Sequence, residues 1–585
     1  MSSIPTDDAT MEQLRLRVPQ VHASTLRDEL ITDSTRRQVL DVRDSHELGT
    51  GTIARPLYCS LRDLAKTAKQ RLPDLDQPLC VVCHGGERSL VAAGHLLDLG
   101  YTDVVSLRGG MRAWLSAGFQ AGNAVVVTPP DDDALSWEAI RDEFPIATRR
   151  IPLLGGGDTE LSYLDHAAST HPPSRVLEHY SRFMAHDYSN VHRGAHHLSR
   201  TATDEFARCY RVIAEFIGGQ LDDSAVIFAS NTTQAIDLCA SVMRKRPGIT
   251  ILTDLEHHSN DLPHRRYGET RRARVLNDGR LDYDHLEHLI ASNRVKLVAM
   301  SGASNVTGWM PDIHRVATLA HAHGARILVD AAQLLAHHPI DVRPLEDPAH
   351  LDFLAGAGHK AYAPFGAAFL FGPRELFDAA PPYLPGGGTA TEVTADDVQW
   401  VASPDRHQGG TPNIGGVIAL AHALEFLEEI GMDRVRAHEL KLTDAVMTRL
   451  LAIDGLTVYG APDPHARLGV LSFNVTGVSD PLTAAILSEE RGVACRNGRF
   501  CAHPYMARLL AAQGGATPAT GHPPGAVRAS FGLYNTEMDV ERLVEACEMI
   551  RRKGWKGRYQ IRGEHVAGEM AARCNDRWME ADTAS

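Results

Sequence analysis

Two short stretches of the chain place a cysteine where a sulfur atom could be held. Cys83 opens the loop 83–89, which contains two glycines, and Cys501 closes the stretch 496–501, which contains two arginines. Cysteine reacts as a thiolate, and nearby arginines or a helix N-terminus favour that anion. The sequence therefore contains two candidate sulfur-carrying thiols. The alternative for Cys501 is an inert buried thiol.

A lysine upstream of the second cysteine could hold a carbonyl compound. Lys360 follows the apolar run 351–355, and Gly356 and Gly358 permit a tight turn there. A lysine whose pKa is lowered by burial can form a Schiff base. Taken alone, the tripeptide Gly-His-Lys favours a solvated turn lysine, so the neighbouring motifs must decide.

Three further residues could bind the other groups of a carbonyl compound held by this lysine. Asp330 comes directly after the buried run 327–329, which suits a carboxylate that keeps a pyridine nitrogen protonated. Thr232 and Thr233 precede a helical stretch, where hydroxyls and backbone N–H groups can bind a phosphate. An anion cradle, a carboxylate and a lysine are the groups that a pyridoxal phosphate site needs.

The elements around these residues predict an α/β protein of more than one domain. At 585 residues the chain exceeds what one core usually supports. Short apolar runs alternate with amphipathic stretches, which favours parallel sheets covered by helices. We expect the following divisions: a small parallel-sheet domain at 11–122, a linker at 123–135, a large α/β domain at 136–417, a smaller C-terminal α/β domain at 418–558 and a polar tail at 559–585.

Composition and charge narrow the function classes. The formal net charge is −14, and no long block of lysine and arginine suggests binding to nucleic acid. The nine cysteines lack the spacing of a disulfide framework or a zinc site, and the histidines form no clear metal motif. No stretch is a secretory signal or long enough to span a bilayer. We therefore expect a cytoplasmic protein with no metal, membrane or nucleic-acid partner.

Several ordered motifs together resemble one enzyme family. From about 136 to 556 the chain is similar to the class V, fold-type I pyridoxal phosphate enzymes, and specifically to group II cysteine desulfurases. The matching stretches include Tyr163–Ala168, Asn190–Gly194, Glu256–Asn260, Ser304–Gly308, Gly410–Asn413, Arg496–Ala502, Arg528–Ser530 and Tyr534–Thr536.

The resemblance implies a role for each residue around the cofactor. Lys360 would hold pyridoxal 5'-phosphate covalently, Asp330 would pair with the ring nitrogen, and His257 would stack on the ring. Gln333 and Asn305 would lie near the ring oxygen or the substrate.

The same resemblance implies the phosphate and substrate contacts. Thr233 and His359 would bind the phosphate beside Thr232, joined by Thr411 from the partner subunit of a homodimer. Arg528 would bind the substrate carboxylate with Arg496 nearby, and Cys501 would accept the sulfur. One departure is Ala357, where the related enzymes usually carry a serine, so one hydroxyl donor to the phosphate is missing.

The segment from about 18 to 120 resembles a rhodanese domain. Asp41–Arg43 lies upstream of Cys83, and Leu107–Trp114 lies downstream. Arg88 and Ser89 complete a Cys-x4-Arg loop, which is one residue shorter than the similar phosphatase loop and is sized for sulfur. The alternative is a rhodanese-like module that only mediates contacts.

Together these motifs predict an L-cysteine desulfurase that releases L-alanine and forms a persulfide on Cys501. The sulfur could pass to Cys83 or to an acceptor protein, for example in iron–sulfur cluster assembly. Two alternatives stay open. The chain could be a selenocysteine lyase or another class V enzyme, or it could be a sulfur carrier or interaction module that binds the cofactor without turnover.

Overall fold

The computed structural model describes residues 8–32, 37–43, 53, 57–61, 64, 67–69, 72, 74–116, 135–364, 366–514, 524–562 and 565–568. The chain divides into two compact units, Met1–Ala134 and Leu135–Ser585. The linker predicted at 123–135 lies outside the described residues except for Leu135. No described helix combines the length and apolar character needed to cross a bilayer.

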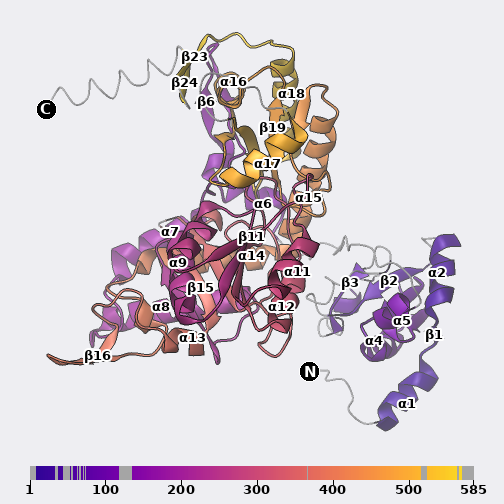
Figure 1. Ribbon diagram of the computed structural model, residues 1–585. Helices are drawn as coiled ribbons and strands as arrows, with labels where there is room; N and C mark the ends of the chain where they lie inside the picture. The colour runs from indigo at the N-terminus through magenta and orange to yellow at the C-terminus, as the bar shows by residue number, and fades with distance from the viewer. Residues whose placement is uncertain are drawn as a thin grey trace. The chain divides into compact units, whose positions relative to one another are not determined.

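The first unit is built on a five-stranded parallel sheet (Figure 1). Its strand order is β1 (Gln20–Val21), β5 (Val104–Leu107), β4 (Leu79–Val82), β2 (Gln38–Asp41) and β3 (Leu57–Tyr58). The three middle strands, β5, β4 and β2, are largely buried, whereas the edge strands β1 and β3 are not. One face packs against α1 (Asp8–Arg17) and α4 (Glu87–Asp98), and the other against α2 (Ala23–Thr32) and α5 (Gly110–Ser116).

The second unit contains a seven-stranded sheet whose middle strands are parallel. Its order is β11 (Thr270–Ala273), β10 (Ile249–Thr253), β12 (Val295–Ser301), β13 (Arg326–Asp330), β14 (Phe353–Ala357), β15 (Ala368–Pro373) and β9 (Ser224–Ala229). β15 runs antiparallel to both of its neighbours. Parallel strands end at the same edge, so the residues after β10, β12, β13 and β14 meet there.

Helices cover both faces of this sheet (Figure 1). One face packs against α8 (His197–Phe216), α11 (Tyr283–Ala291), α12 (Ile313–Ala322) and α14 (Ile414–Ile430). The other face packs against α9 (Thr232–Val242) and α13 (Arg374–Ala379). This doubly covered sheet confirms the predicted α/β class.

A smaller antiparallel sheet follows in the same unit. Its strand order is β18 (Leu456–Val458), β19 (Val470–Val475), β22 (Ala526–Ser530) and β21 (Arg496–Gly498). A separate core joins it to α15 (Met432–Leu451), α16 (Asp480–Arg491) and α18 (Glu537–Arg551). The boundary expected at 417/418 falls inside α14, whose apolar residues pack with the large sheet, so the change of core comes at α15.

The beginning of the predicted polar tail has regular structure. β23 (Tyr559–Arg562) pairs antiparallel with β24 (His565–Gly568). The hydroxyl of Tyr559 donates to Glu490 of α16 at 3.1 Å. Sequence periodicity missed this hairpin because each strand has only four residues.

Candidate active site

Lys360 and Asp330 face the same space at the carboxyl edge of the large sheet. Asp330 ends β13, and Lys360 ends the single turn Gly358–Lys360 that follows β14. Burial, with a contribution from the charge of Arg528, lowers the pKa of Lys360 to about 8, although the charges of Asp330 and Cys501 oppose this shift. These opposing effects place the four groups close together in the fold.

The carboxyl group of Asp330 is almost fully buried. It accepts a hydrogen bond from the backbone N–H of Ala332 at 3.0 Å. Burial raises the pKa of this carboxyl, while that hydrogen bond and the Lys360 charge lower it. An aspartate in this setting can share a proton with a basic ring nitrogen brought next to it.

His257 is held as a neutral ring. Burial lowers its pKa to about 3, and the charges of Lys360 and Arg528 contribute to the shift. Its Nδ1 accepts the backbone N–H of Ser259 at 3.1 Å, which fixes the ring. A neutral imidazole fixed in this way can stack on a flat cofactor.

The residues predicted to bind phosphate gather around the start of α9. The hydroxyls of Thr233 and Ser259 are 2.7 Å apart, and the hydroxyl of Thr232 donates to the Gly356 carbonyl at 3.3 Å. Burial lowers the pKa of His359 to about 4, so its ring is neutral. Thr233, Ser259 and the N-terminal amides of α9 offer donors to a phosphate. The side chain of Ala357 offers none.

Arg528 lies on β22 and is fully buried beside one carboxylate. Its Nη2 is 3.3 Å from Oδ1 of Asp165, and its Nη1 donates to the Asn305 carbonyl at 2.9 Å. Burial lowers the pKa of Arg528 to about 10, which leaves it charged at neutral pH. Its Nε has no hydrogen-bond partner among the described residues. A substrate carboxylate would satisfy that donor.

Asp165 also binds the second predicted arginine. The Nη2 of Arg496 is 2.9 Å from Oδ2 of Asp165, although about half of the Arg496 side chain is exposed. The charge of Cys501 acts on Arg496, so that guanidinium lies near the thiol. Sequence reasoning gave Asp165 no role, although it lies within the Tyr163–Ala168 motif.

Two contacts fix the backbone that carries Cys501. The side-chain amide of Asn305 donates to the Phe500 carbonyl at 2.6 Å, and the backbone N–H of His258 donates to the Cys501 carbonyl at 2.7 Å. Phe500 and Cys501 both adopt φ of 53°, the left-handed region. The Cys501 side chain is exposed, which is unlike the inert buried thiol considered as its alternative.

Beneath the site, a buried carboxyl group missed by sequence reasoning joins three donors. Glu256 accepts from Asn260 Nδ2 at 2.6 Å, from Ser301 Oγ at 2.8 Å and from the Thr253 hydroxyl. Burial nevertheless raises its pKa to about 7. This network fastens the loop that carries His257 to the ends of β10 and β12. Only its place before His257 in the Glu256–Asn260 motif could have indicated it.

Gln333 is buried, and only one of the two polar atoms of its side-chain amide has a hydrogen-bond partner among the described residues. Its Nε2 donates to the Ala167 carbonyl at 2.7 Å, while its Oε1 has no partner in the described structure. Thr411 lies apart from these contacts, exposed in the loop ahead of α14.

The first unit holds Cys83 in a separate cradle. Cys83 is 1% exposed, and its Sγ accepts the backbone N–H of Gly86 at 3.1 Å. Its thiol donates to the Ser89 hydroxyl at 3.4 Å, and Ser106 donates to that hydroxyl at 2.9 Å. Gly86 has φ of 95° and precedes α4, so the loop turns its amide toward the sulfur. Arg88 is partly buried in the first turn of α4.

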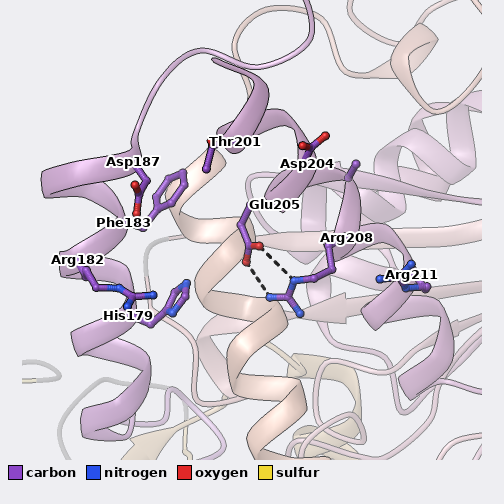
Figure 2. Close-up of a pocket in the computed structure, with 10 residues that line it drawn as sticks. His179, Arg182, Phe183, Asp187, Thr201, Asp204, Glu205, Arg208 and Arg211 are labelled. Carbon is purple, nitrogen blue, oxygen red and sulfur yellow. Dashed lines mark hydrogen bonds and ion pairs between the residues drawn. The ribbon is translucent and has the colours of Figure 1, made fainter. Parts of the chain in front are cut away.

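A surface cleft of about 690 Å³ lies elsewhere in the second unit (Figure 2). It lies between α8 and α7 (Ser174–Arg182), and its lining contains none of the predicted site residues. Side-chain atoms of His179, Glu205 and His422 come within 4.8 Å of one another here. Arg208 pairs with Glu205 at 2.8 Å, as Figure 2 shows, so this carboxylate already has a counterion.

Comparison with known proteins gives matches to both units. Residues 162–543 match the Aminotransferase class-V family, and residues 23–117 match the Rhodanese-like domain. A cysteine desulfurase of Haloferax volcanii is 35% identical over 434 residues, which cover 71% of this chain and 96% of that protein. A cysteine desulfurase of Escherichia coli O127:H6 is 35% identical over 428 residues, covering 71% and 98% respectively.

Solved structures of cysteine desulfurases also align with this chain. The apo cysteine desulfurase of Thermococcus onnurineus NA1 aligns with a TM-score of 0.63 at 31% identity, covering 71% of this chain and 98% of that one. The cysteine desulfurase CsdA of Escherichia coli, solved as its S-sulfonic acid, aligns with a TM-score of 0.62 at 29% identity, covering 72% and 100%.

Proposed function

Because the chain belongs to the class-V aminotransferase family, among the cysteine desulfurases, and also carries a rhodanese-like domain, we propose that it moves sulfur from L-cysteine to Cys501 and then to Cys83. The desulfurase activity follows from the family. The residue roles and the order of transfer are the proposal. The group II assignment is proposed with them, on the motifs described above.

The observation that carries this proposal is the grouping of Lys360 with Asp330, Arg528 and Cys501. Each of the last three shifts the pKa of the lysine, so one substrate bound at Lys360 could meet all of them. Arg528 would bind the substrate carboxylate through its unpartnered Nε. Cys501 would then lie on the side where the substrate sulfur emerges.

The family depends on pyridoxal phosphate, and the residues fit that group. Asp330 suits the ring nitrogen, the neutral His257 suits the ring face, and the unpartnered Oε1 of Gln333 offers an acceptor at the rim. The start of α9 with Thr233 suits the phosphate. Bound there, the cofactor supplies an aldehyde that captures the substrate amine and a ring that accepts electrons from Cα.

The protein side chains perform the remaining steps. With its pKa lowered to about 8, Lys360 is partly uncharged near neutral pH, so its Nζ can take the proton from the substrate Cα. The Cys501 thiolate attacks the substrate sulfur, forming an S–S bond as the carbon–sulfur bond breaks. The electrons of that bond return to the carbon skeleton, which is protonated and leaves as alanine.

The proposal extends to assembly and location. We propose a homodimer in which the exposed Thr411 of one subunit completes the phosphate site of the other. All eight described cysteines are free thiols, which suits the reducing cytosol. The sulfur would leave on Cys83 or on an acceptor protein, with iron–sulfur assembly as one destination.

Alanine release from L-cysteine tests the proposal. The wild type should release alanine, and Cys501→Ser should lose most of it, since a serine hydroxyl cannot form a persulfide. Cys547→Ser, at a buried thiol on α18, is the matched control. Equal rates in all three proteins would contradict the role of Cys501, and faster release from selenocysteine than from cysteine would assign a selenocysteine lyase instead.

A further inference from the structure

A second cleft lies at the opposite edge of the large sheet from Lys360. It has a volume of about 440 Å³ and lies where β10, β12 and β13 begin. Its lining includes Lys296 and Arg294 at the start of β12 and His323 just before β13. His257, Asn305 and Asp330 follow or end the same three strands, so roughly 20 Å of strand separates this cleft from the cofactor site.

Positive charge is concentrated around this cleft. Its lining contains six basic side chains, from Arg244, Lys245, Arg246, Arg294, Lys296 and His323, and no acidic one. Within the described part of the chain, none of the five lysines and arginines pairs with a carboxylate. The protein as a whole has a net charge of −14, so this surface differs sharply from the average.

Lys296 is the decisive residue because it is buried. It is 6% exposed, and its Nζ lies 3.3 Å from where a Cβ on Gly268 would stand. Burial lowers the pKa of its ammonium group, and no neighbouring carboxylate compensates. Its charge instead helps to lower the pKa of the adjacent His264 to about 4. An ammonium group that is partly removed from water and has no counterion is destabilised, and an anion entering the cleft would offset that cost.

The C-terminus of α9 explains only part of this concentration of positive charge. Helix C-termini attract cations, which suits Arg244, Lys245 and Arg246 directly after α9. Lys296 and Arg294 come from a different segment and converge on the same space. Part of the lining is an apolar wall formed by Val242, Leu376, Ala379, Ala380 and Pro381.

We propose that this cleft binds a small phosphorylated molecule with at least two negative charges. The volume suits a small ligand, since binding cavities begin at about 300 Å³. The guanidinium groups can bind phosphate oxygens in pairs, and Lys296 can approach them as a point charge. The apolar wall would contact an organic group attached to the phosphate. This site is independent of the desulfurase reaction.

Calorimetric titration of the cofactor-loaded enzyme with inorganic pyrophosphate at low ionic strength tests the proposal. The loaded cofactor keeps pyrophosphate out of the phosphate site at α9. The wild type should bind one pyrophosphate per chain. Lys296→Met should weaken binding by roughly tenfold to a hundredfold, as expected for the loss of one charge-assisted hydrogen bond. Its alanine release without pyrophosphate should stay at the wild-type rate.

Lys441→Met is the matched control. Lys441 lies on α15 and is paired with Glu537 on the surface, so this variant should bind pyrophosphate as the wild type does. Arg294→Gln provides a second test at an exposed position, and it should also weaken binding. Unchanged binding in both Lys296→Met and Arg294→Gln, or an equal loss in Lys441→Met, would overturn the site.

Two further titrations test the ligand class. Inorganic phosphate should bind more weakly than pyrophosphate, because it carries less charge. Adenosine diphosphate should bind at least as tightly as pyrophosphate if the apolar wall contacts an organic group. A hexaglutamate peptide that binds more tightly than either would overturn the assignment to a small phosphorylated molecule and indicate an acidic protein segment.

Discussion

The two thiols proposed to carry sulfur have opposite surroundings. Cys501 is exposed, and it lies on a backbone in the left-handed region with the charged groups of Lys360 and Arg496 nearby. Cys83 is buried, and a backbone amide and a hydroxyl contact its sulfur. The exposed thiol suits the proposed attack on a substrate, and the enclosed thiol suits the proposed binding of an anion.

This difference suits a donor and an acceptor of sulfur. A persulfide on the exposed Cys501 is accessible to another thiol. A persulfide on Cys83 would be held by amides at the start of α4, where the helix also favours negative charge. Cys83 is 1% exposed, so its sulfur is far less accessible than that of Cys501.

The largest expected effect comes from a substitution that stops alanine release and leaves the reaction of Cys83 unchanged. Lys360→Arg removes the amine that we propose takes the Cα proton, so alanine release should fall by roughly 10²–10⁴-fold. The reaction of Cys83 with thiosulfate and cyanide should keep its wild-type rate, because that thiol lies in a different compact unit. If Lys360→Arg released alanine at the wild-type rate, the catalytic role proposed for Lys360 would be wrong.

The next effect tests the cradle of Cys83. In Gly86→Ala the new Cβ would lie 2.8 Å from the Gly109 nitrogen, at a φ of 95°. The strain of about 1–3 kcal/mol should distort the loop and slow the thiosulfate reaction. Gly85→Ala is the control, since nothing lies within 4 Å of its added Cβ. Equal rates in the two variants would show that the Gly86 amide does not matter.

A smaller effect is expected in the pH dependence of cofactor capture by Lys360. The uncharged amine is needed to capture pyridoxal phosphate, and its pKa is lowered to about 8. The uncharged fraction rises as pH rises through this value, so capture by the cofactor-free enzyme should become roughly tenfold faster from pH 7 to pH 9. Absorbance of the bound cofactor measures the rate. A rate that is flat over this range would contradict the lowered pKa.

The smallest effect is expected for Cys83→Ser. With a small thiol present as sulfur acceptor, alanine release should stay within about twofold of the wild type, because in the proposed order Cys83 acts after the chemical step. Persulfide on the first unit should disappear. A large fall in alanine release would mean that Cys83 takes part in turnover itself.

The sequence predicted residues that end strands better than residues that meet across the fold. Asp330 and Lys360 follow apolar runs that form β13 and β14, so their common edge could be inferred from parallel topology. The contacts of Asp165 with Arg496 and Arg528 span 331 and 363 positions. No local pattern shows such a pairing.

Local conformation was also beyond the sequence pattern. The left-handed backbone of Phe500 and Cys501 is unusual for residues other than glycine, and long-range contacts from Asn305 and His258 hold it. The basic cleft combines three segments, each too short to suggest charge clustering by itself. These features depend on tertiary packing rather than on local composition.

The order of persulfide formation tests the central claim most directly. The enzyme would receive one equivalent of L-cysteine, and peptides containing Cys501 and Cys83 would be followed over time by mass spectrometry. The account predicts an added sulfur first on Cys501 and later on Cys83, with neither modified in Cys501→Ser. An added sulfur on Cys83 in the Cys501→Ser variant would contradict it.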